Sequence, residues 1–161
     1  MKMKQIFTLI MALAIGLASA LAEETNVCIG GIYYLLDSEN HTAKVYYDDT
    51  TYGQTDRKYP NLKDLVIPSK VTSDGQDYVV TEIADYTFYY CYNLWSVSFP
   101  ETLTTIGNNA FTWCQNLKSV SLPEAVTTIG KGAFASCQRL TSVTLPTTLT
   151  EIGDYAFYGC I

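Results

Sequence analysis

Residues 94–161 read LWSVSFPETLTTIGNNAFTWCQN (94–116), LKSVSLPEAVTTIGKGAFASCQR (117–139) and LTSVTLPTTLTEIGDYAFYGCI (140–161). The three segments repeat one pattern every 23 residues, and Pro100, Pro123 and Pro146 mark its period. A fixed period in so short a unit is typical of a solenoid, in which stacked repeats bury one another. The sequence therefore predicts a stack of repeats rather than a globular core.

Each repeat has two halves. In the leading half Val97 and Phe99 alternate with serines, as in a half-buried strand. In the trailing half the apolar residues from Ile106 to Cys114 fall at i, i+4, i+5 and i+8, which fits one face of a short helix. Gly107 follows the isoleucine, where we expect a tight turn that uses the conformational freedom of glycine. The predicted unit is a strand, a corner and a helical arch.

The recurring apolar residues form the predicted core of the array. They are Val97, Phe99, Ile106, Phe111, Cys114, Val120, Leu122, Ile129, Phe134, Cys137, Val143, Leu145, Ile152, Phe157 and Cys160. Because ordering one short repeat costs more free energy than its own apolar burial contributes, the repeats must stack to fold.

The leading segments that begin at Leu94, Leu117 and Leu140 resemble the strand signature of leucine-rich repeats. The trailing Ile-Gly-x-x-Ala-Phe-x-x-Cys resembles the variant found in BspA-like surface proteins, and the resemblance covers residues 62–161. It departs from the general pattern at an expected asparagine ladder, where Thr102, Ala125 and Thr148 stand instead. The resemblance implies an α/β repeat solenoid: a right-handed leucine-rich-repeat-like array with a strand and a short helical arch in each repeat.

The N-terminus predicts a secretory signal peptide at residues 1–22. Lys2 and Lys4 precede an apolar run, and small residues follow it at a cleavage site before Glu23. Residues 23–61 lack the repeat, and two β-rich runs at 32–36 and 43–47 flank a polar loop there. We expect them to form a β-hairpin that caps the array, followed by a surface connection over 48–59.

The array is predicted to span residues 62–161. Its first repeat, 62–93, is longer than the others, because 15 residues separate Pro68 from Ile83 whereas Pro100 and Ile106 are 6 apart. The nine extra residues include Asp74-Gly75 between β-prone runs, which predicts an inserted hairpin.

The last repeat, 140–161, is one residue short of a full unit and leaves an edge strand near 142–145. Two interpretations remain open. The sequence is a fragment of a longer array, or copies of the chain associate through this end.

Four cysteines recur with the repeat, at Cys91, Cys114, Cys137 and Cys160. Stacking places their Cβ atoms about 4.8 Å apart, wider than the ~3.8 Å typical of a disulfide. We therefore predict buried free thiols, with disulfides as the alternative. The state of Cys28, outside this column, is left open.

Charge and composition argue against several classes of function. Loss of Lys2 and Lys4 with the signal peptide changes the formal net charge from −6 to −8, which disfavours nucleic acid. After that loss no basic amphipathic segment remains for membrane insertion. His41 is the only histidine, and the cysteine spacing fits no zinc motif. The sequence thus predicts no enzyme, metal site or cofactor.

Two candidate binding surfaces remain. The first is the outward face of the leading strands, with Lys63, Trp95, Ser98, Lys118 and Ser121. Its alternative is an ordinary solvated strand face. The second surface is aromatic and is made of Tyr86, Tyr89, Tyr90, Tyr92 and Trp113. These rings either pack beneath a hairpin or form an exposed contact cluster for a protein partner.

The resemblance implies a secreted or cell-surface module that acts in adhesion and binds proteins. The expected partner is an extracellular protein, either of a host matrix or on another microbial cell. The alternative is a structural spacer that carries a functional domain beyond residue 161.

Overall fold

The structure is a computed structural model that describes residues 24–47, 59 and 61–161, and these residues contain twelve β-strands and no helix. The predicted signal peptide and nearly all of the predicted connection at 48–59 lie outside the described residues. In chain order the strands are β1 (Glu24–Ile29), β2 (Ile32–Asp37), β3 (Thr42–Val45), β4 (Asp64–Val66), β5 (Lys70–Ser73), β6 (Gln76–Ile83), β7 (Ser96–Ser98), β8 (Thr105–Ile106), β9 (Ser119–Ser121), β10 (Thr128–Ile129), β11 (Ser142–Thr144) and β12 (Glu151–Ile152).

The first three strands form an antiparallel meander. β2 and β3 pair as the hairpin that the sequence predicts, and β1 adds a strand that the prediction lacks. Gly30 and Gly31 connect β1 to β2 at φ values of 59° and 82°. Positive φ at both central residues is the geometry of a two-residue hairpin turn, so the Gly-Gly pair was the available signal for β1.

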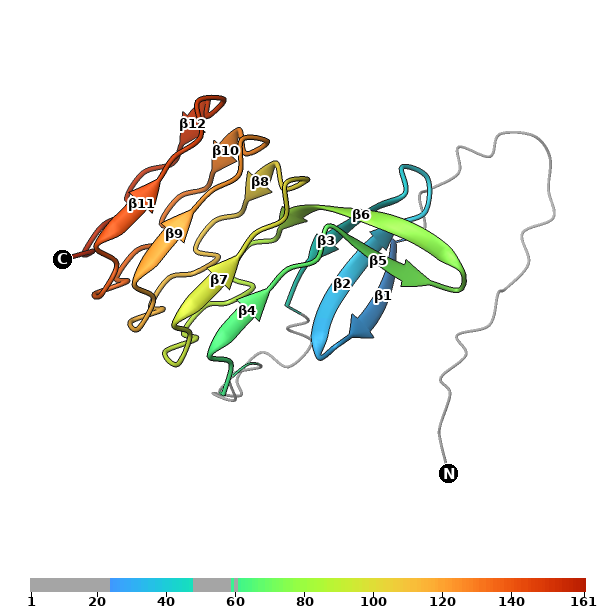
Figure 1. Cartoon of the computed structure of the whole chain (residues 1–161), viewed down its shortest axis with the longest axis horizontal. Coiled ribbons are helices and arrows are strands. Elements are labelled where there is room, and N and C mark those ends of the chain that lie inside the picture. Colours follow the sequence, from blue (N-terminus) through green and yellow to red (C-terminus); the bar gives the residue numbers. More distant parts are fainter. Residues whose placement is uncertain (1–23, 48–58, 60) are drawn as a thin grey trace, which may run out of the picture.

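The meander is joined to the array through β3, which pairs in parallel with β6. Beyond that pairing, the Ala84 N–H donates to the Val45 carbonyl at 2.8 Å, and the ring of Tyr59 packs 5.4 Å from that of Phe88. The meander thus lies against the first repeat, at the N-terminal end of the stack in Figure 1.

The inserted hairpin is formed by β5 and β6, which pair antiparallel. Its turn holds Asp74 and Gly75 at φ values of 49° and 81°, as the Asp-Gly signal predicts. β6 runs beyond the hairpin to Ile83, where it pairs in parallel with β8.

The repeats stack in parallel and form two sides of the solenoid (Figure 1). On the trailing side a single eight-stranded sheet has the order β1-β2-β3-β6-β8-β10-β12, with β5 paired to β6. On the leading side the three-residue strands form two separate parallel pairs, β4 with β7 and β9 with β11. In-register pairs such as Ile106 with Ile129 preserve the 23-residue offset of the sequence.

The predicted helical arch is wrong. In the second repeat Asn109 and Trp113 have φ values of 53° and 65°, which a right-handed helix excludes. The N–H groups of Asn109, Phe111 and Trp113 donate instead to carbonyls of the following repeat, at 2.8, 2.7 and 2.9 Å. Because these donors are used between repeats, none is available for a helical bond within the repeat. The trailing half is a two-residue strand followed by tight turns.

The glycine that follows the isoleucine in each of the last three repeats is required because no side chain fits there. Its φ is not positive, so backbone conformation is not the reason. A Cβ on Gly130 would lie 2.6 Å from the Asn108 nitrogen and 2.6 Å from the Gly107 carbonyl carbon. A Cβ on Gly153 would lie 2.4 Å from the Lys131 nitrogen. Glycine is needed here because adjacent main chains approach closely.

Columns of identical side chains fill the interior. The rings of Phe88, Phe111, Phe134 and Phe157 stack with centroids 5.1, 5.2 and 5.5 Å apart. Ile106 and Ile129 are fully buried beside them. In the last repeat the predicted core residues Leu145 and Ile152 are exposed, because no later repeat packs on them among the described residues, and the other three there are half-buried.

Candidate interaction surfaces

The leading-strand face consists of short side chains around one large one. Ser98 and Ser121 are exposed on β7 and β9, as the alternation of each strand requires. Lys63, Trp95 and Lys118 each lie one residue before their strands and are exposed as well. The structure thus brings the first set of candidate residues onto one face, with Trp95 as its largest aromatic group.

Trp95 lies close to two cationic side chains of the next repeat, one near its start and one at its end. Lys118 Nζ lies 4.8 Å from the centroid of the indole ring, and Arg139 Cζ lies 5.8 Å from it. Both distances are within the range of cation–π attraction. Arg139 is absent from the residues predicted for this face. Asn93 and Asn116 hold its repeat position in the preceding repeats, so the change of residue type was the available signal.

The five residues predicted for the aromatic surface form one continuous cluster, which we call the aromatic cluster. Ring centroids are 5.6 Å apart for Tyr86 and Tyr89, 4.2 Å for Tyr89 and Tyr90, and 5.4 Å for Tyr90 and Tyr92. Trp113 stacks on Tyr90 at 5.7 Å. Tyr86 is 52% exposed and Tyr89 37%, so the described parts of the hairpins leave this cluster accessible.

Three members of the aromatic cluster occupy strained backbone positions. Tyr86, Tyr90 and Trp113 have φ values of 57°, 61° and 65°. The left-handed region costs about 1–2 kcal/mol for a residue other than glycine. Other repeats hold Asn109, Gly132, Ser136, Tyr155 and Gly159 at the same two positions, and all of these except Tyr155 are smaller residues that include the types best suited to such geometry.

The hydroxyl of Tyr89 is affected by its neighbours. Partial burial and a hydrogen bond with Tyr90 raise the pKa of Tyr89 to about 12. The hydroxyl of Tyr89 is therefore uncharged at neutral pH.

Polar side chains connect the repeats in two ladders that the sequence analysis missed. The hydroxyls of Thr104, Thr127 and Thr150 each donate to the carbonyl of the preceding rung, at 3.0, 3.4 and 3.0 Å. Asp85 Oδ1 accepts from the Asn108 N–H at 2.7 Å, and Asn108 Oδ1 accepts from the Lys131 N–H at 2.8 Å. The recurrence of these residue types at 23-residue spacing was the signal for both ladders.

At the positions where leucine-rich repeats in general carry an asparagine ladder, two threonines form comparable hydrogen bonds. Thr102 Oγ1 donates to the Val80 carbonyl at 2.6 Å, and Thr148 Oγ1 donates to the Val126 carbonyl at 3.1 Å. Ala125 has no such group, so this ladder is interrupted in the third repeat.

Comparison with known proteins decides the family. Residues 81–161 match the family described as BspA type leucine rich repeat region. The chain belongs to the BspA-type leucine-rich-repeat family. This confirms the resemblance that the repeat motifs indicate.

Three solved structures illustrate proteins that share the fold. A protein from Bacteroides capillosus is 32% identical with a TM-score of 0.66, over 81% of this chain and 88% of that one. The leucine rich repeat protein of T. pallidum is 24% identical with a TM-score of 0.61, over 84% and 68%. The pneumococcal vaccine antigen PcpA is 16% identical with a TM-score of 0.53, over 78% and 39%. No curated protein matches the chain.

In this BspA-type array the cysteine column is internal. Cys114 and Cys137 are buried free thiols, as predicted, and Cys160 is a half-buried one. Each donates to the carbonyl of a phenylalanine in the preceding repeat, at 3.3 Å. Burial raises the pKa of Cys137 to about 12 and raises that of Cys114 well above its ordinary value. The thiols therefore stay protonated, and a protonated buried thiol is a poor nucleophile.

The described residues of the BspA-type repeats and of their cap offer few groups for catalysis or metal binding. No group of three or more His, Cys, Asp or Glu side chains is placed to hold a metal ion within residues 24–47, 59 and 61–161. His41 is exposed in the β2–β3 turn, with its ring 6.2 Å from that of Tyr78. Among the same residues, no helix is long and apolar enough to span a membrane.

Proposed function

We propose that this chain is a non-catalytic protein-binding module of a secreted or cell-surface protein, and that it acts in adhesion. Its family supports the coarse assignment, since leucine-rich-repeat proteins are typically non-catalytic interaction proteins. The sequence pattern of residues 1–22 supports export. The expected partner is an extracellular protein of a host matrix or of another microbial cell.

The observation that carries this proposal is the aromatic cluster. Five large rings gather on one surface, four from the first repeat and Trp113 from the second, and three of them occupy positions where a glycine or asparagine would fold at lower cost. Tyr155 of the last repeat has the same strained geometry at a φ of 61° but lies outside the cluster, so it is the gathering of five adjacent rings, rather than strain alone, that supports binding. Exposed tyrosine and tryptophan side chains also supply most of the binding energy in many protein interfaces.

The neighbouring repeat shows how to remove the surface without disturbing the fold. Asn109 and Thr112 occupy the positions of Tyr86 and Tyr89 in the second repeat, and Asn109 has a φ of 53°. The double variant Tyr86→Asn/Tyr89→Thr therefore replaces one repeat surface with that of its neighbour. Tyr155→Asn/Tyr158→Thr is the matched control, because these exposed tyrosines hold the same two positions in the last repeat.

The test is binding of both variants and the unmodified chain to a panel of extracellular matrix proteins and microbial surfaces. We expect saturable binding by the unmodified chain and by the control, and a loss of about tenfold or more in the cluster variant. Circular dichroism checks that all three are folded. Equal binding by the cluster variant would exclude the cluster as the contact surface, and no binding across the panel would favour the structural spacer.

A further inference from the structure

The leading-strand face carries a second feature that the aromatic cluster does not explain. Trp95 is 40% exposed, yet its ring lies against two cations from the next repeat, Lys118 near its start and Arg139 at its end. The N–H of Trp95 also donates to the Lys63 carbonyl at 2.7 Å, which places a third cationic residue, exposed as well, next to the tryptophan. Stacking of the repeats thus brings one indole ring and three cationic residues together from four segments of the chain.

This gathering of positive charge contrasts with the whole molecule, whose net charge is −6. Elsewhere on the described surface, ion pairs join Lys44 to Glu82 at 3.1 Å and Lys70 to Asp77 at 2.5 Å. Lys118 and Arg139 contact an aromatic ring instead, and within the described residues they have no carboxylate partner. Their charge therefore remains available to a ligand.

We propose that Trp95, Lys118 and Arg139, together with Lys63, form a docking site for an acidic segment of a partner protein. The guanidinium group of Arg139 can bind a carboxylate through two parallel hydrogen bonds, and Lys118 supplies a second positive charge. The indole ring provides the apolar contact that charged groups alone lack. Ser98 and Ser121 lie on the adjacent strands and the exposed Val66 pairs with Ser98, so beyond the ring an extended peptide meets two serines and one valine in this row.

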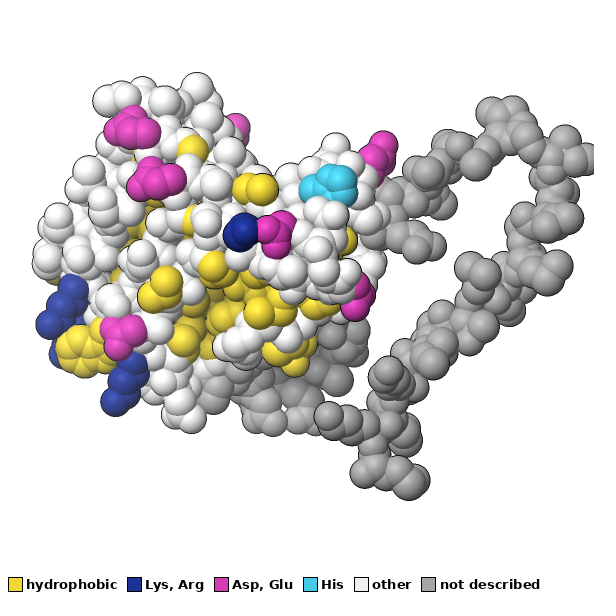
Figure 2. All heavy atoms as spheres, turned by 45° about the vertical axis from the view of Figure 1, so that its right-hand side comes forward, with side chains coloured by type: hydrophobic (Ala, Val, Ile, Leu, Met, Phe, Trp, Pro, Cys, Tyr) yellow, Lys and Arg dark blue, Asp and Glu magenta, His cyan; other side chains and the backbone are white. Residues whose placement is uncertain are grey.

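The surroundings favour a peptide over a polyanionic glycan. Asp64 lies on the same face, where Ser96 Oγ donates to its carboxylate at 2.5 Å, so the positive region is short. Charges more than about 8 Å apart are screened at physiological salt, and a long polyanion would also meet the negative charge of the rest of the molecule. Figure 2 shows a few basic side chains around hydrophobic surface at one edge of the molecule, with an acidic group beside them.

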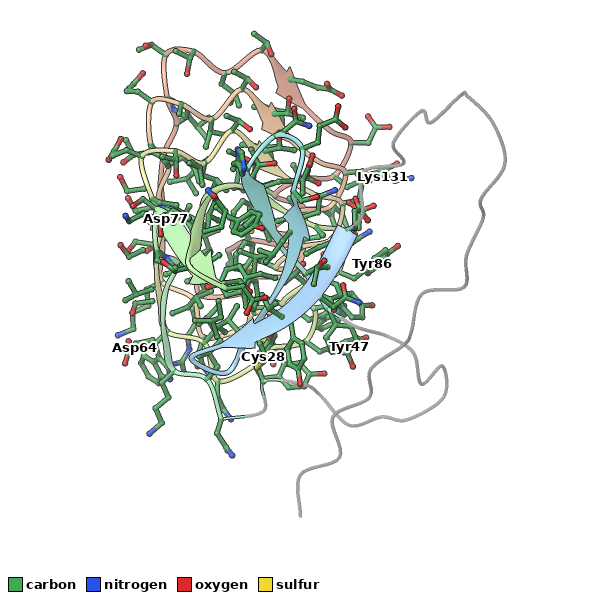
Figure 3. All side chains as sticks on the ribbon, turned by 90° about the vertical axis from the view of Figure 1, so that its right-hand side faces the viewer. Cys28, Tyr47, Asp64, Asp77, Tyr86 and Lys131 are labelled. Carbon is green, nitrogen blue, oxygen red and sulfur yellow. The ribbon has the colours of Figure 1, made fainter. Side chains whose placement is uncertain are left out.

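The site is separate from the aromatic cluster. Figure 3 shows Asp64, the neighbour of Lys63 in the sequence, on the opposite side of the molecule from Tyr86. Lys131 is on the same side as Tyr86 in that view, and its side chain is exposed. It therefore serves as a matched control for the loss of one positive charge.

The test is a fluorescence titration of the purified chain with a short peptide of alternating aspartate and leucine. Its counterpart with asparagine in place of aspartate is the neutral control. The titration uses a Trp113→Phe background, so that Trp95 is the sole tryptophan and its emission reports the site directly. Heparin and phosphatidylserine vesicles are titrated in parallel.

We expect the acidic peptide to change Trp95 emission saturably and the neutral peptide to bind at least about tenfold more weakly. Lys118→Gln and Arg139→Gln should each weaken binding several-fold and together about tenfold, whereas Lys131→Gln should leave it unchanged. Tyr86→Asn should also leave it unchanged, which separates this site from the cluster. Equal binding of both peptides, unaltered binding in the Lys118→Gln/Arg139→Gln variant, or binding of heparin or vesicles alone would overturn the proposal.

Discussion

The two sides of the solenoid differ in what they contribute. The leading side carries the Leu-x-x-Val signature of leucine-rich repeats in general, yet its strands are three residues long and form two separate pairs. The trailing side has two-residue strands in its regular repeats, but they belong to one sheet that continues into the cap. The phenylalanine stack, the thiol hydrogen bonds and the close main-chain approach also belong to the trailing half. We infer that the trailing side provides most of the cohesion between repeats, whereas the leading side can vary its outward residues.

The sharpest test of this difference removes one buried side chain from each side. Phe134 stacks between Phe111 and Phe157 and is fully buried, so Phe134→Ala should lower the free energy of unfolding by about 4 kcal/mol. Val120 is buried in β9 on the leading side, and Val120→Ala should lower the free energy of unfolding by about 2 kcal/mol. Urea denaturation followed by circular dichroism measures both. Equal losses would contradict the greater cohesion of the trailing side.

The close approach of main chains on the trailing side predicts a second effect. Gly130→Ala should destabilise the protein by about 3 kcal/mol, because its methyl group would meet two main-chain atoms at 2.6 Å. Gly31 in the cap has a φ of 82° but open space around it, so Gly31→Ala should cost only about 1 kcal/mol. Urea denaturation of the two variants tells whether a close main-chain contact or a positive φ costs more stability. A larger loss for Gly31→Ala than for Gly130→Ala would show that backbone conformation dominates.

Alkaline pH should weaken the trailing side through its thiols. The folded-state pKa of Cys137 is about 12 against an ordinary 9.0, so its contribution to stability is complete below pH 9.0 and is lost as the pH rises toward 12. The expected slope is about 1.4 kcal/mol per pH unit for this thiol. Cys137→Ala should remove that slope, while the same change at the exposed Cys28 should not. Identical pH profiles for Cys137→Ala and the unmodified chain would exclude the thiol as the cause.

The smallest effect is expected at a varied surface position. Tyr86→Asn loses a ring contact with Tyr89 but relieves the cost of a tyrosine at a φ of 57°. These changes nearly cancel, so stability should change by less than about 1 kcal/mol. Thermal unfolding provides the measurement. A large destabilisation would mean that the aromatic cluster is part of the core rather than a binding surface.

The sequence was sufficient for the repeat, its register and both hairpins, because each depends on local signals such as Asp74-Gly75 or on the 23-residue period. It was insufficient for the trailing half. The apolar spacing from Ile106 to Cys114 also fits a helix, and only the pairing of main chains between repeats decides against one. Asn109, Gly132 and Gly159 carried the missing information, since these residue types tolerate positive φ.

The candidate surfaces also divide into a part that local sequence signals predict and a part that depends on contacts between repeats. The outward residues of the leading strands were accessible to sequence reasoning, because alternation along a strand fixes which side chains point outward. Arg139 was not, because its contact with Trp95 joins residues 44 positions apart, in consecutive repeats, through the conformation of long side chains. The aromatic cluster was identified from composition, although the expected helix was the wrong framework for it.

The pairing of β3 with β6 has a consequence for how the chain folds. Partners within the regular repeats are 23 residues apart, as for Ile106 and Ile129, whereas Thr42 of the cap pairs with Val79, 37 residues later. Contacts that are closer in sequence form faster because less chain must be ordered to close them. We therefore expect the folding nucleus to arise among the regular repeats and the cap to dock afterwards. Substitutions in β3 should then accelerate unfolding while leaving the folding rate nearly unchanged.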